Sequence, residues 1–156
     1  MKAITLTQPW ATLVAIGAKQ IETRSWATRY RGPLAIHAAA GLGPVGGKSG
    51  LAFQCCCEPF LSALRAAGIK HHNDLPFGAI VATCELVEVY QIPIHQPLTG
   101  FYADDSSRCW NLTEQERAFG DYTPGRYAWL LANVQRLPEP IPARGQLGLW
   151  NWEGSL

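Results

Sequence analysis

Residues 77–90, "FGAIVATCELVEVY", limit the fold of this chain more than any other segment. They are rich in β-branched side chains, and their alternation places the apolar series from Ile80 to Leu86 on one face and Glu85 on the other. Apolar residues at a period of two are typical of a strand that buries one face. The sequence therefore predicts the strongest strand of the chain here.

Weaker patterns predict further strands and helices on both sides of this segment. Strands are expected at residues 2–6, at 20–26, within 30–40 after a turn, at 125–137 and at 145–152. Helices are expected at residues 7–17, at 51–67 with a break at Pro59, and within 112–120. Residues 41–50 read as a glycine-rich loop, and 93–124 as otherwise irregular, with a polar loop at Asp104 and Asp105.

The order of these elements predicts the fold class. Strands and helices do not alternate as in a regular βαβ protein, so we expect an α+β fold with a curved, mostly antiparallel sheet or small barrel. The prolines at 138, 140 and 142 are expected to form a link between the last two strands, because proline cannot sit in a central strand.

Composition excludes several functional classes. The 156 residues fit one domain, and a net charge of +1 with 16% charged residues describes neither a disordered polyelectrolyte nor a broadly basic protein. Any contact with nucleic acid must therefore be local. The N-terminal run reaches Pro9 too early for a secretory signal, and no apolar run is long enough to span a membrane. We expect a cytoplasmic protein with no membrane contact.

Several motifs in the chain do not indicate a metal or cofactor. Cys55, Cys56 and Cys57 are adjacent, which is neither a disulfide framework nor the C-x2-C spacing of a zinc site, and their role stays open. The run "GKS" ends like a P-loop, but Leu42 stands where its first glycine belongs. Lys48 in this loop could still line a cleft. We expect no cofactor and no metal.

The stretch "GAKQIETRSW", residues 17–26, concentrates charge in a chain that has little of it. Its alternation places Glu22, Arg24 and Trp26 on one face of a strand. A network of surface ion pairs and a ligand site are both compatible with this pattern. In a ligand site, Lys19 and Arg24 would hold phosphates, Glu22 would accept from a base amino group, and Trp26 would stack on a base.

Gly17, Lys19, Glu22 and Arg24 fit the pattern G-x-K-x-x-E-x-R, which, together with five further segments, resembles the ASCH domain family over nearly the whole chain. The further segments are "QPWA", "RSWATRYRGPLAIHA", "GAIVATCELVEV", "GRYAWLLANVQRL" and "PARGQLGLWNW". The resemblance implies a PUA-like fold, a small β-barrel with flanking helices whose cleft binds RNA or nucleosides. It implies one domain over residues 1–156, with a loop and helix inserted at about 40–75 that rims the cleft.

Two functions are compatible with this resemblance. The first is a module that binds single-stranded RNA or a modified nucleotide, with affinity that falls as salt rises. Its candidate binding residues are Lys19, Glu22, Arg24, Trp26, Arg29, Arg31 and Lys48. The second is a metal-independent ribonuclease or nucleoside amidohydrolase that uses the same cleft. Its candidate catalytic residues are Lys19, Glu22, His37, Glu85 and Tyr127.

Three details qualify the candidates. In the amidohydrolase branch a threonine follows the lysine by three positions, whereas Glu22 stands there in this chain. His37 is either a core group or a catalyst, and Glu85 is expected to pair with a cation such as Lys19. Replacing Lys19 or Arg24 with alanine is expected to weaken ligand binding and to leave the thermal midpoint nearly unchanged.

Overall fold

The structure is a computed structural model, and it describes residues 1–93, 100–102 and 109–155. The strands are β1 (Lys2–Leu6), β2 (Ile21–Arg24), β3 (Gly32–Ala38), β4 (Ala79–Gln91), β5 (Gly100–Tyr102), β6 (Cys109–Asn111), β7 (Tyr127–Pro142) and β8 (Leu149–Asn151). The helices are α1 (Trp10–Ala15), α2 (Gly47–Cys56), α3 (Phe60–Ala66) and α4 (Glu114–Phe119), with 3-10 turns η1 (Gly43–Val45) and η2 (His72–Asp74). This order confirms the expected α+β class.

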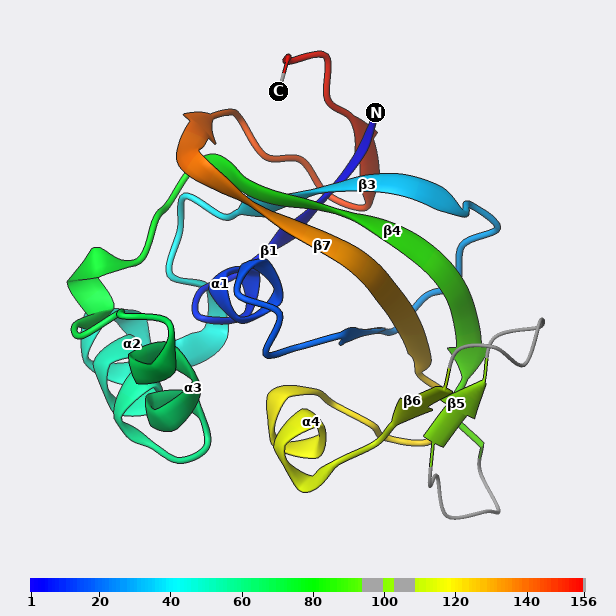
Figure 1. The fold of residues 1–156 in the computed structure, drawn as a ribbon, viewed down its shortest axis with the longest axis horizontal. Coiled ribbons are helices and arrows are strands. Elements are labelled where there is room, and N and C mark those ends of the chain that lie inside the picture. The colour runs from blue at the N-terminus through cyan, green and yellow to red at the C-terminus, as the bar shows by residue number, and fades with distance from the viewer. Residues whose placement is uncertain (94–99, 103–108, 156) are drawn as a thin grey trace.

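A curled, six-stranded sheet in the order β2-β7-β4-β3-β1-β8 forms the body of the molecule (Figure 1). The pair β1 and β3 is parallel, and the other neighbouring strands are antiparallel. The register between β4 and β7 shifts at three points along its length. Such bulges bend and twist a strand pair, which lets this long hairpin curl into a half-barrel. The expected PUA-like, mostly antiparallel architecture is confirmed.

Strand β4 behaves as its sequence predicts. Ile80, Ala82, Cys84 and Leu86 are each at most 5% exposed, whereas Glu85 faces solvent. Ala82, Cys84 and Leu86 belong to a core that also contains Trp129 of β7, and Ile80 packs in a separate cluster with Trp150.

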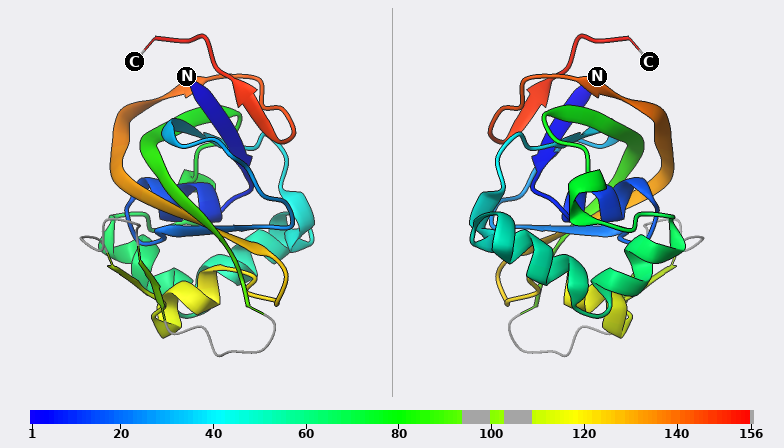
Figure 2. Two further views of the ribbon diagram at one scale, coloured as in Figure 1. Left: turned by 90° about the vertical axis from the view of Figure 1, so that its right-hand side faces the viewer. Right: turned by 90° about the vertical axis from the view of Figure 1, so that its left-hand side faces the viewer.

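Helix α1 packs inside the curl of the sheet, where Val14 joins the main core and Leu13 a second apolar cluster (Figure 2). The helix is followed by Gly17, whose φ of +76° lies in the left-handed region that glycine adopts most readily. The chain can therefore reverse direction and enter β2 within a few residues.

Residues 41–50 differ from the expected glycine-rich loop, whereas the helices expected within 51–67 are confirmed. Helix α2 already begins at Gly47, and α3 follows the predicted break at Pro59. Leu51, Phe60 and Leu64 of these helices pack with Leu13 and with Phe119 of α4. The apolar contacts made after folding stabilise a helix in a stretch whose glycines alone predict a loop.

The prolines near the C-terminus also depart from expectation, because β7 continues through Pro142 instead of ending in a link. Strand β2 pairs only with the first four residues of β7, from Tyr127 to Leu130. In the part of the chain that the structure describes, the proline-containing half of β7 therefore has β4 as its neighbour on one side and no strand on the other. An edge position of this kind tolerates proline.

The region 93–124 is more regular than expected where it is described. Helix α4 confirms the short helix expected within 112–120, and β5 and β6 form an antiparallel pair. The polar loop expected at Asp104 and Asp105 lies outside the described residues. In the described ranges, no helix combines the length and apolarity that crossing a membrane requires.

Candidate functional site

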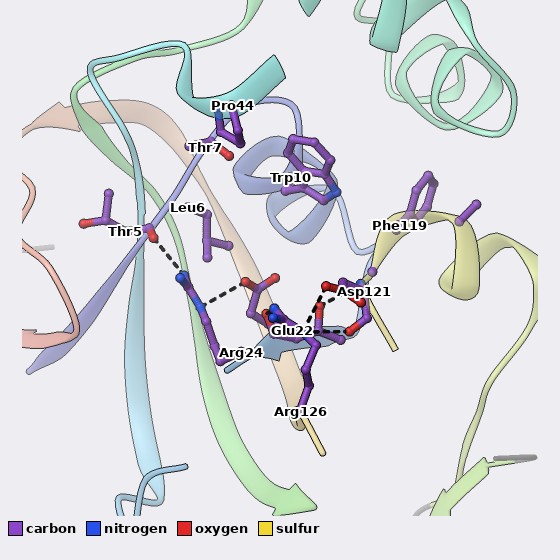
Figure 3. Close-up of a pocket in the computed structure, with 13 residues that line it drawn as sticks. Thr5, Leu6, Thr7, Trp10, Glu22, Arg24, Pro44, Phe119, Asp121 and Arg126 are labelled. Carbon is purple, nitrogen blue, oxygen red and sulfur yellow. Dashed lines mark hydrogen bonds and ion pairs between the residues drawn. The ribbon is translucent and has the colours of Figure 1, made fainter. Parts of the chain in front are cut away.

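A cleft of about 510 Å³ opens where β1, the start of α1, β2 and the turn after α4 meet (Figure 3). It is lined by Thr5, Leu6, Thr7, Trp10, Glu22, Thr23, Arg24, Pro44, Ala118, Phe119, Gly120, Asp121 and Arg126. Trp10 and Pro44 lie on one side of this cleft, and Glu22, Arg24 and Arg126 lie on the other. It thus combines aromatic and guanidinium groups with carboxylates.

Lys19 lies beneath the cleft, with 1% of its side chain exposed. Its ammonium donates to the carbonyl of Ile21 and lies 3.8 Å from Glu22 Oε2 and 3.6 Å from Glu116 Oε1. Gly17 and Lys19 occupy the turn between α1 and β2, and a side chain in this turn can point inward. The structure therefore places Lys19 under the cleft as a counter-ion to two carboxylates.

Glu116 of α4 completes this cluster from a position 97 residues along the chain from Lys19. Its carboxylate accepts from the amides of Gln20 and Ile21, at 3.0 and 3.2 Å. Burial raises the pKa of Glu116, and the Lys19 charge and the two amides oppose that rise. Together these contacts hold the beginning of β2 against α4.

Sequence reasoning did not identify Glu116 as a site residue. The spacing of Thr113 and Glu116 is that of a helix capping box, in which the glutamate would reach back to the threonine amide. Thr113 does cap α4, since its hydroxyl accepts from the Glu116 amide at 3.1 Å. The Glu116 side chain instead crosses to Gln20 and Ile21. A local motif gives no signal for such a distant partner.

Glu22 and Arg24 lie side by side on β2, as the predicted alternation requires. Arg24 Nε is 3.1 Å from Glu22 Oε1, and Arg24 Nη2 donates to the carbonyl of Thr5 at 2.8 Å. Strands β1 and β2 are not neighbours in the sheet, yet its curl brings them to the same cleft. Arg24 therefore bridges the seam of the half-barrel while a quarter of its side chain (25%) remains exposed.

The turn after α4 supplies a second ion pair at the cleft. Arg126 Nε lies 3.2 Å from Asp121 Oδ2, and the amide of Asp121 donates to the Thr23 hydroxyl at 3.0 Å. Hydrogen bonds from the side chain and amide of Thr123 lower the pKa of Asp121. Asp121 is thus a carboxylate at neutral pH. Asp121 belongs to no motif that the sequence singles out, and Arg126 lies in the segment "GRYAWLLANVQRL" without being a candidate site residue, because both become neighbours of β2 only through the fold.

The other candidate binding residues lie outside the lining of this cleft. Trp26 packs edge-on against Trp129, with ring centroids 4.7 Å apart. Arg31 pairs with the carboxylate of Glu88 and donates to the carbonyl of Thr28 at 2.9 Å. Arg29 and Lys48 are exposed elsewhere on the surface.

The candidate catalytic residues do not converge on the cleft either, apart from Glu22. His37 is 1% exposed, and its Nε2 donates to the carbonyl of Ala143 at 2.9 Å. Tyr127 is half-buried against the main core. Glu85 is exposed and accepts from Asn133 Nδ2 at 2.7 Å, so the expected pairing of Glu85 with Lys19 is wrong. The ammonium of Lys19 instead pairs with Glu22 and Glu116.

Comparison with known proteins gives a family and two relatives. The family model described as "ASCH domain" matches residues 4–141. The chain is 32% identical over 156 residues to Activating signal cointegrator 1 of Homo sapiens and 22% identical to that of Mus musculus. Each alignment covers 98% of this chain but only 22% of the relative, so the chain spans about a fifth of the length of these proteins.

Replacing Lys19 with methionine should strongly destabilise the protein. The burial of Lys19 overturns our expectation of an unchanged thermal midpoint, because the variant would leave Glu22 and Glu116 without their shared cation. Breaking a buried ion pair costs about 3–5 kcal/mol, which urea denaturation would detect. Lys48→Met, at an exposed site, is the matched control and should change the free energy of unfolding by less than about 0.5 kcal/mol. Equal effects of the two substitutions would contradict a structural role for Lys19.

His37 should make the protein less stable at mildly acidic pH. Burial lowers the pKa of His37 below its ordinary value, although the bond to Ala143 acts the other way. Below about pH 6.5 the unfolded chain therefore binds a proton that the native imidazole resists. The free energy of unfolding should fall between pH 7 and pH 5 more steeply in the wild type than in His37→Gln. Parallel pH profiles from urea denaturation would refute this assignment.

Proposed function

This chain belongs to the ASCH domain family, and from that premise we propose that its cleft binds single-stranded RNA or a nucleotide. The observation that carries the proposal is the pairing of an aromatic wall at Trp10 with guanidinium groups at Arg24 and Arg126. Unpaired bases favour aromatic surfaces, and guanidinium groups donate to phosphate or carbonyl oxygens in a fixed plane. Both kinds of contact are available within one cleft.

Each part of the G-x-K-x-x-E-x-R motif has its own role in this proposal. Glu22 and Arg24 line the cleft and contact the ligand. Lys19 is a positioning residue, because its buried ammonium reaches Glu22 and the Ile21 carbonyl. Gly17 supplies the left-handed turn that brings Lys19 beneath β2. In this proposal, Gly17 and Lys19 set the shape of one wall of the cleft, and Glu22 and Arg24 supply two polar contacts to the ligand.

A binding module agrees better with the cleft than the hydrolase alternative. Metal-independent cleavage of RNA needs a base, an acid and a cation around one substrate. His37 is buried against Trp150, and Glu85 is bonded to Asn133, so neither lies among the lining residues. Incubating the pure protein with labelled single-stranded RNA and a chelator tests this choice. Cleavage that disappears in the Glu22→Gln variant would favour the enzyme, whereas intact RNA would favour the module.

Replacing Arg126 with glutamine should weaken RNA binding. The side chain of Arg126 is 29% exposed at the cleft, and its loss removes a charged donor from the site. We expect an affinity roughly tenfold lower for a fluorescein-labelled single-stranded decamer of mixed sequence, measured by anisotropy. Arg65→Gln on α3 is the matched control, since Arg65 is exposed and lies outside the cleft.

The two arginine variants separate a specific site from general attraction. The proposal predicts that Arg65→Gln binds RNA as the wild type does, and that both variants keep their thermal midpoints within a few degrees. Equal losses of affinity in the two variants would mean that RNA responds to net charge alone. The proposed site would then be wrong.

A further inference from the structure

The charged groups that line the cleft are paired and balanced. Arg24 lies beside Glu22 at 3.1 Å, and Arg126 lies beside Asp121 at 3.2 Å. Two guanidinium groups thus meet two carboxylates among the lining residues, and their formal charges cancel. Beneath them, the ammonium of Lys19 is matched by Glu116. The cleft is polar without carrying an excess of positive charge.

This balance is unfavourable for a phosphate at the floor of the cleft. A phosphate that reached Arg24 would also approach the Glu22 carboxylate, whose pairing with Arg24 and Lys19 holds it in place. Like charges repel more strongly where water is partly excluded, and only 12% of the Glu22 side chain is exposed. A neutral group with both donors and acceptors meets no such repulsion.

Resting on the proposed function, we propose that a nucleobase enters this cleft edge-first and is read by Glu22 and Arg24. The carboxylate of Glu22 accepts from an exocyclic amino group, and Arg24 donates to the neighbouring ring nitrogen or carbonyl. The selected class is the amino-bearing bases, cytosine, adenine and guanine. Uracil is disfavoured, because carbonyls flank its single N–H donor and one of them would face the carboxylate.

The floor of the cleft is held ready for such an edge. Lys19 fixes Glu22 from below, and the Thr5 carbonyl fixes the guanidinium of Arg24 at 2.8 Å. Groups that are already oriented lose little entropy when a ligand binds. Trp10 and Pro44 add apolar surface opposite this floor, as Figure 3 shows. A flat, neutral base would meet apolar walls and a polar floor.

Homopolymeric RNA hexamers test the inference with phosphate charge held constant. Oligocytidylate, oligoadenylate and oligouridylate carry the same backbone, so a difference in affinity reports the bases. By calorimetry we expect the cytidine and adenosine hexamers to bind roughly tenfold more tightly than the uridine hexamer. Uracil has no amino group to donate to the Glu22 carboxylate, and the loss of one hydrogen bond to a charged acceptor has about this effect. The ratio should persist when salt is raised, because electrostatic release of counterions is common to all three.

The Glu22→Gln variant should lose this preference, since an amide can also donate to the uracil carbonyl. Glu139→Gln, exposed on β7 outside the cleft, is the matched control and should keep it. Circular dichroism tests whether each variant is folded. If Glu22→Gln does not fold, the comparison of the three hexamers with the wild-type protein still tests the inference. Equal binding of all three hexamers by the wild type would overturn base reading and leave RNA binding intact. Failure of all three to bind would overturn the proposed function itself.

Discussion

The buried ammonium of Lys19 is the contact on which the candidate site depends. An ion removed from water needs charged and hydrogen-bonding partners, and Lys19 has Glu22, Glu116 and the Ile21 carbonyl. Glu116 also accepts from the amides at the beginning of β2. One cluster therefore joins the turn after α1, the strand β2 and the helix α4. Two walls of the cleft are fixed relative to each other by this cluster.

The curl of the sheet explains why the cleft lies at this place. Bulges between β4 and β7 bend the sheet until β2, at one end of the strand order, approaches β1 near the other. Arg24 spans that seam through its bond to the Thr5 carbonyl. Its guanidinium is consequently both a brace for the half-barrel and a donor exposed to the cleft. Arg24 therefore contributes both to the packing of the half-barrel and to the proposed contact with the ligand.

Local patterns predicted the parts of this molecule that local geometry decides. The period-two alternation placed Glu22 and Arg24 together and identified the buried face of β4. Lys19 lies in a turn, where no periodicity tells whether a side chain points to solvent or inward. The sequence also predicted a loop before residue 51, although apolar contacts with α1 and α4 support a helix that begins at Gly47.

Partners distant in the chain were beyond this kind of prediction. Glu116, Asp121 and Arg126 become neighbours of β2 only when α4 and the turn after it pack beside that strand. The expected partnership of Glu85 with Lys19 failed for the same reason, because opposite charges in a sequence do not reveal which pairs meet. The exclusion of proline from central strands led to the expectation of a link at the prolines of β7. These prolines instead lie on an edge of the sheet, and only the strand order shows where the edges are.

Mapping an RNA ligand onto the backbone would test the location of the site most directly. Titration of the isotope-labelled protein with a single-stranded RNA hexamer, followed by amide nuclear magnetic resonance shifts, reports which residues respond. If the cleft above the Lys19 cluster is the binding site, the largest shifts will fall on Glu22, Arg24 and residues 119–126. Shifts confined to α2 and α3, with Glu22 and Arg24 unchanged, would contradict it.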